Sequence, residues 1–112
     1  MTKRAILLVH TNPVSPDRES EFNEWYDHTH IPQILSNVPG MIGASRYVIA
    51  DSSPSTPRHR YLAVYDIEAD DPAAVVQALG EAVAAGRVDV SDVLDMSEPG
   101  PLALYEVTGD GR

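Results

Sequence analysis

The sequence predicts an α+β fold of the ferredoxin-like type, βαββαβ, in which a four-stranded antiparallel sheet carries two helices on one face. Short apolar runs rich in strand-forming residues alternate with two longer stretches of helical periodicity. The order strand, helix, strand occurs twice, which is the split βαβ arrangement. Right-handed crossovers then place both helices on the same face of the sheet.

The chain begins with a strand and a helix. Arg4 to Asn12 is an apolar run that ends at the turn signal Asn12-Pro13, and it is too short for a typical helix. Capping residues and a proline follow, and apolar residues then recur at helical spacing from Pro16 to His28. We therefore expect a buried strand and then the first helix.

Pro32 interrupts the helical pattern. Proline lacks a backbone N–H and disfavours helical dihedrals in the residue before it. We therefore expect a break or kink near Thr29 to Ile31, before a short second helix through Leu35. Pro39-Gly40 ends this segment, and the β-rich residues from Ile42 to Asp51 predict a second strand.

The second half of the chain repeats this order of elements. A Ser/Pro loop over Ser52 to Pro57 leads to a third strand from Tyr61 to Ile67. Asp70 to Ala85 reads as an amphipathic helix with an acidic cap. Val88 to Met96 has no clean period and is expected to be short extended or irregular structure, while Leu102 to Thr108 predicts the last strand.

Both faces of the predicted sheet are apolar. Alternate residues of a strand point to opposite faces, yet Ile6 and Leu8 are as apolar as Leu7 and Val9. The third and fourth strands share this property. Two helices cover only one face, so we expect the other face to pack on the sheet of an identical subunit.

The composition limits the classes of partner. The 112 residues fit one domain, residues 1–112, and 43% hydrophobic with 22% charged residues is typical of soluble globular proteins. A net charge of -9 repels nucleic acid and anionic membranes. Without cysteine there is no disulfide or thiolate site, and the apolar run near the start is too short for a signal peptide. We expect a cytoplasmic protein.

The segment from Phe22 to Pro32 contains Trp-Tyr-Asp, two further residues, and His-Ile-Pro. With Pro39-Gly40 and the basic Arg46 in the following strand, it resembles the EthD-like members of the dimeric α+β barrel superfamily. The resemblance is close over Glu21 to Tyr47; elsewhere only element order and length agree.

The resemblance implies two protomers paired sheet to sheet, each with a pocket between its sheet and its helices. Members of the superfamily include cofactor-independent monooxygenases, haem-degrading and haem-dependent enzymes, isomerases, polyketide cyclases and decarboxylases. Carried over to this chain, the resemblance implies Asp27 and His30 as the polar pair of the pocket, with Trp25 and Tyr26 beside them.

The spacing of Asp27 and His30 allows a catalytic pair. Residues three apart share a helix face, so the carboxylate would orient the imidazole as a general base. Alternatively, both side chains merely satisfy backbone groups at the kink. Glu24 and His28 have the spacing of two metal ligands, but no third ligand is fixed, so a solvated face is the favoured interpretation and no metal is expected.

Other candidates for substrate contact come from the strands. His10 and Tyr65 converge on the pocket only if strand parity places them there; otherwise they face the dimer core or solvent. Arg46 would bind a substrate carboxylate or enolate, or else form a structural ion pair, which a chain this acidic favours at least as much. Trp25 and Tyr26 are adjacent and must splay apart, so one of them is expected to pack in the core.

The leading functional hypothesis is a homodimeric enzyme without an organic cofactor. It would use His30 for proton transfer on a small aromatic, lactone or polyketide-like substrate, as an isomerase, cyclase or lyase. The alternatives are a monooxygenase, cofactor-free or haem-dependent, and a non-catalytic protein that binds a small molecule.

Overall fold

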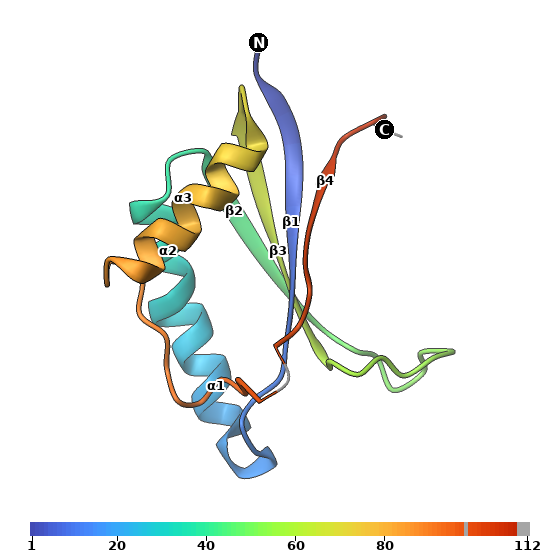
Figure 1. Ribbon diagram of the computed structural model, residues 1–112. Helices are drawn as coiled ribbons and strands as arrows, with labels where there is room; N and C mark the ends of the chain where they lie inside the picture. Colours follow the sequence, from blue (N-terminus) through green and yellow to red (C-terminus); the bar gives the residue numbers. More distant parts are fainter. Residues whose placement is uncertain (98, 110–112) are drawn as a thin grey trace.

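A computed structural model describes residues 1–97 and 99–109 of the chain. Its centre is one antiparallel sheet with the strand order β2-β3-β1-β4 (Figure 1). The strands are β1 (Lys3–Thr11), β2 (Met41–Val48), β3 (Tyr61–Ala69) and β4 (Leu102–Glu106). The first and third strands of the chain therefore lie in the middle of the sheet, and β2 and β4 are its edges.

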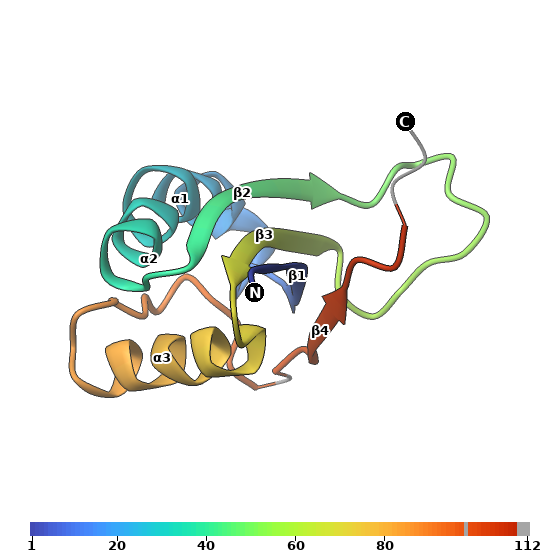
Figure 2. The ribbon, with the colours of Figure 1, turned by 90° about the horizontal axis from the view of Figure 1, so that it is seen from above.

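The helices lie together on one side of this sheet (Figure 2). They are α1 (Glu19–Trp25), α2 (Ile31–Asn37) and α3 (Pro72–Ala84). A short 3-10 turn over Pro16–Arg18 leads into α1. This arrangement confirms the predicted βαββαβ fold. Among the described residues, no helix is long and apolar enough to cross a membrane.

The irregularity predicted before Pro32 is present as a wider turn followed by a short second helix, but the helical segment does not end there. A π-helical turn over Tyr26–His30 joins α1 directly to α2, and Ile31 keeps helical dihedrals. The N–H of Ile31 donates to the carbonyl of Tyr26, five residues earlier. Pro32 has no backbone N–H to donate. The wider hydrogen-bond spacing of the π turn allows the helix to continue through this position.

The turn between α2 and β2 requires glycine. Gly40 has a φ of +99°, a region that side chains rarely adopt. A Cβ at this position would lie 2.7 Å from Cγ2 of Val75 in α3. The Pro39-Gly40 turn therefore allows α3 to pack closely beside the start of β2.

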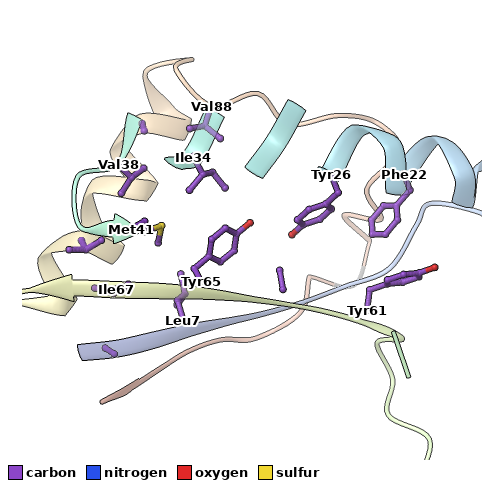
Figure 3. Close-up of a cluster of buried hydrophobic side chains, with 14 of the residues drawn as sticks. Leu7, Phe22, Tyr26, Ile34, Val38, Met41, Tyr61, Tyr65, Ile67 and Val88 are labelled. Atoms are coloured by element: carbon purple, nitrogen blue, oxygen red, sulfur yellow. The ribbon is translucent and has the colours of Figure 1, made fainter. Parts of the chain in front are cut away.

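The core lies between the sheet and the helices. Leu7, Tyr65 and Ile67 point from the strands toward the helices and are each 1% exposed. Phe22 and Tyr26 come down from the helical segment to meet them (Figure 3). Large aromatic side chains thus fill much of the interior in which the superfamily resemblance implies a pocket.

The other face of the sheet is also apolar, as predicted. Strand register places Ile6, Leu8, Leu62 and Val64 on this face, and all four are only partly buried. We call this surface the open face. Because apolar contacts contribute about 25 cal/mol for each Å² removed from water, an open face of this kind favours association.

The connection between β2 and β3 projects away from the helices (Figures 1 and 2). We call residues 49–60 the arm. The side chain of Asn12 holds its base, because it donates to the carbonyl of Arg58 at 3.1 Å and accepts from the N–H of Arg60 at 2.7 Å. The arm therefore leaves the sheet from a fixed starting point.

Candidate functional site

Arg46 is the polar centre of the site. It lies opposite Ala63 in the sheet and points toward the helices. Its Nη1 donates to Oδ1 of Asp27 at 3.0 Å, and its Nη2 donates to Oδ1 of Asn23 at 2.9 Å. The side chain is only 12% exposed, so two residues of the helical segment hold a nearly buried cation in one position.

Aromatic rings surround the same guanidinium. Its Cζ lies 4.5 Å from the ring centre of Tyr26, 5.3 Å from that of Phe22 and 5.4 Å from that of Tyr61. Cation–π attraction favours this position. A guanidinium has five N–H donors, and the bonds to Asn23 and Asp27 leave some of them available to an oxygen of a ligand.

An open groove passes over Arg46. It has a volume of about 590 Å³. The lining residues come from α1, the π turn, β2 and β3: Asn23, Asp27, Arg46, Tyr47, Val48 and Tyr61. We call it the Arg46 groove. Its size suits a small organic molecule.

Tyr61 is fixed at the edge of the Arg46 groove. Its hydroxyl donates to the carboxylate of Glu19, and the Nδ2 of Asn23 donates to the same hydroxyl at 3.4 Å. Burial and the neighbouring Glu19 carboxylate raise the pKa of Tyr61. Asn23 thus links the Tyr61 hydroxyl to the Arg46 guanidinium.

His30 is buried among rings at the end of the π turn. It stacks on Trp25 with centroids 4.4 Å apart and meets Tyr26 edge-on at 5.0 Å. Its Nδ1 lies 3.1 Å from the backbone carbonyl of Asp89. A carbonyl only accepts, so Nδ1 carries a proton, and burial lowers the pKa of His30, which favours the neutral ring with a lone pair on Nε2. The geometry is that of a neutral, oriented imidazole.

Asp27 does not orient His30, which corrects the predicted pair. The Asp27 carboxylate binds Arg46. The backbone carbonyl of Asp89, and not the Asp27 carboxylate, accepts the hydrogen bond from His30. The physical reason is the π turn, because its wider spacing removes the shared face that residues three apart have on an α-helix.

Two buried phenols lie between the sheet and the π turn. Figure 3 shows the hydroxyls of Tyr26 and Tyr65 pointing toward one another. The Tyr65 hydroxyl is inaccessible to solvent and has no hydrogen-bond partner among the described residues. Burial raises the pKa of both phenols. The neighbouring Tyr26 hydroxyl also raises the pKa of Tyr65, so the two phenols interact with each other inside the core.

Strand parity separates two of the predicted site residues. Tyr65 pairs with Leu7 and faces the helices, whereas His10 pairs with Leu62 and faces the open side. They do not converge on one pocket. Tyr26 packs in the core at 2% exposure, as expected for one residue of the pair Trp25 and Tyr26. Their rings meet with centroids 5.4 Å apart, because both lean on His30.

Sequence reasoning missed Asn23, Tyr61 and Asp89. Asn23 could have been found, since it precedes Asp27 by four residues and so shares its helix face. Asp89 has no such signal, because its part in the site is a backbone carbonyl. Glu24 and His28 are exposed, and within residues 1–97 and 99–109 no cluster of three or more acidic or His side chains could hold a metal.

No protein-family model matches the chain, and no curated protein matches its sequence. Similar solved structures include HapK from Hahella chejuensis, with 14% identity, a TM-score of 0.61 and coverage of 96% of both chains. A proposed monooxygenase from Shewanella loihica PV-4 has 17% identity and a TM-score of 0.60, covering 98% of this chain and 99% of that one. An EthD family protein from Bacillus halodurans C-125 has 16% identity and a TM-score of 0.46, covering 96% and 100%.

The first two likenesses support the α+β fold and nothing finer, because their identities are low. The signature over Glu21 to Tyr47 is not tested by them. Membership in the EthD-like group therefore remains a prediction from that segment.

Acid is expected to destabilise the fold through His30. Burial lowers the pKa of His30 from its usual 6.5, so the unfolded chain takes up this proton before the folded chain does. The contribution of neutral His30 to stability is complete above about pH 6.5 and declines as the pH falls. Urea unfolding from about pH 8 to pH 5 should show a flatter pH dependence in His30→Gln than in the unsubstituted protein. Equal slopes would contradict this.

Proposed function

We propose that the protein is an enzyme that moves a proton on a small aromatic, lactone or polyketide-like substrate. Arg46 binds the oxyanion of the substrate, and His30 is the base. The supporting observation is the guanidinium of Arg46, which is 12% exposed, held by Asn23 and Asp27, and open to the Arg46 groove. A preorganised cation of this kind stabilises negative charge that develops on an enolate or phenolate oxygen.

His30 is buried and does not line the Arg46 groove, so the proposed step requires the substrate to pass the Tyr26 ring, which contacts both Arg46 and His30. Nε2 of His30 then removes a proton from a carbon that is activated by a neighbouring carbonyl or phenol. The electron pair of the C–H bond moves into the enolate, and the charge on oxygen is met by the N–H donors of Arg46. His30 then returns the proton to a different carbon of the same molecule. The product is an isomer of the substrate, and the base is regenerated without an organic cofactor.

Tyr26 and Tyr65 support this assignment of the reacting region. Tyr26 contacts both partners, with its ring under Arg46 and against the edge of His30. The raised pKa values keep both phenols protonated at neutral pH. Both phenols are buried, so they act as neutral groups of the core, and Tyr26 packs beside Arg46 and His30.

The test is hydrogen–deuterium exchange at carbon, measured by proton NMR in deuterated buffer. The panel consists of small phenols, lactones and 1,3-dicarbonyl compounds. We expect the protein to accelerate exchange in at least one of them, and His30→Gln to lower that rate by about 100-fold or more, the usual contribution of a general base. The matched control is His28→Gln, which changes an exposed histidine of the same turn and should leave the rate unchanged. An unchanged rate in folded His30→Gln would overturn the role of His30.

A monooxygenase is the second candidate. It is favoured by the proposed monooxygenase from Shewanella loihica PV-4, which has the same fold. An oxygen electrode with the same phenols separates the two reactions, because oxidation consumes O₂ and proton transfer does not. A compound that binds and is recovered with neither exchange nor oxidation would instead indicate a binding protein.

We also propose that the working unit is a homodimer joined through the open face. Leu8 and Val64 lie opposite one another on adjacent strands, and Ile6 and Leu62 lie two positions away on the same face, opposite Asp66 and His10. Tyr105 extends this surface onto β4 opposite Ile6 and is 55% exposed in the single chain. A second copy of the same face would cover these side chains.

A further inference from the structure

We propose that the ligand of the Arg46 groove is amphipathic, with an anionic oxygen on Arg46 and an apolar part that lies in a second hollow beneath the arm. This inference rests on the proposed function. It adds the chemical class of the ligand and a region that determines specificity.

The second hollow is lined by the ends of β2 and β3 and by the arm. Its volume is about 580 Å³. Ile49, Pro54 and Pro57 of the arm contribute apolar side chains to its wall, and His10, Tyr47 and Leu62 line it where it borders the open face. Hollows of this size and character hold small organic molecules, and a chain of several methylene groups or a second ring would fit.

The two hollows adjoin one another. Tyr47, Val48 and Tyr61 line both of them. Tyr47 is 55% exposed and Val48 is 52% exposed, so two large apolar residues remain in contact with water at the passage between the hollows. A ligand that crosses this passage would bury both side chains, which favours its binding.

The path follows the free edge of the sheet. Since β2 is an edge strand, no other strand within the described part of the chain pairs with its outer side. Arg46 and Val48 point toward the helices, while Tyr47 points to the open face. The polar end of the path is therefore at Arg46, Asn23 and Asp27, and its apolar end is under the arm.

The test is calorimetric titration with benzoate and its 4-ethyl, 4-butyl and 4-hexyl derivatives. We expect the affinity to rise by about fourfold for each methylene group that enters the second hollow. Ala50→Trp fills the hollow from the exposed base of the arm, and it should abolish this rise while leaving the affinity for benzoate unchanged. Ala74→Trp, on the exposed side of α3, is the matched control and should keep the rise.

The outcomes separate this inference from the proposed function. Benzoate binding that needs Arg46, without a rise along the series, overturns the amphipathic ligand and leaves the proposed function standing. Absence of binding by every acid overturns both. A rise that persists in Ala50→Trp and in Ser52→Trp also overturns the inference, because the chain then lies elsewhere; Ser52→Trp serves alone if Ala50→Trp does not fold. If a second copy of the protein occupies the hollow, the affinity will not rise along the benzoate series, and Ala50→Trp or Ser52→Trp will weaken the dimer. That result also overturns the inference of an amphipathic ligand.

Discussion

Arg46→Gln is expected to weaken the binding of benzoate by about 10- to 150-fold, the range for loss of a charged hydrogen-bonding partner. The effect should be large because Asn23, Asp27 and the ring of Tyr26 hold the guanidinium in place before a ligand arrives. Arg46→Lys keeps the charge but not the planar fork, so it should recover only part of the affinity. Calorimetric titration at low salt measures both.

The matched control for Arg46 is Arg18→Gln. Arg18 also binds two acidic side chains, Glu21 and Asp92, but it does not line the Arg46 groove. Arg18→Gln lowers the net charge by the same amount as Arg46→Gln. Comparing the two variants therefore separates direct binding at Arg46 from the effect of the protein's overall charge. Equal affinities in Arg46→Gln and Arg18→Gln would show that Arg46 does not hold the anion.

Val64→Lys is expected to convert the homodimer into a folded monomer. Val64 lies in the middle of β3, between Leu8 and Ser45 of its neighbouring strands, and faces the open side. In a dimer the new ammonium group would be buried without a partner, which costs several kcal/mol. In a single protomer it would face water, so circular dichroism should remain that of the parent protein.

Sedimentation velocity at micromolar concentration measures this change. Gln77→Lys adds the same charge on the exposed side of α3 and should leave the dimer intact. A monomeric parent protein would disprove the homodimer. A dimer that survives Val64→Lys would place the interface on another surface.

The fold was predictable because its signals are local. Apolar runs of strand length and the helical spacing of apolar residues are visible among neighbouring residues. The apolar character of both faces of β1 and β3 is visible in the same way. The π turn was not predictable in the same way. Pro32 indicates that a hydrogen bond is lost, but it does not indicate whether the chain breaks or widens its turn.

The site was predicted only in part, for the same reason. Residue type, spacing and the family resemblance predicted Arg46, His30 and Tyr65 as site residues; the structure places all three on the helix side of the sheet, and their roles stay predictions. Their partners depend on tertiary contacts. The backbone carbonyl of Asp89, 59 residues after His30, accepts from the His30 ring. No side-chain pattern in the sequence predicts this contact.

The sequence also could not predict strand parity, that is, which residues of each strand point toward the helices. When both faces of a strand are apolar, alternation cannot tell which residues meet the helices. The register of β1 with β3 decides it, and it sends His10 and Tyr65 to opposite faces.

Transfer NMR contacts between benzoate and the protein would test the central claim most directly, since that claim is that an anion binds at Arg46 between the helical segment and β2. We expect the ring protons of bound benzoate to give contacts to Tyr47, Val48 and Tyr61, and the side-chain N–H resonances of Arg46 to shift in the same titration. Contacts confined to residues outside the Arg46 groove, with the Arg46 resonances unmoved, would contradict it.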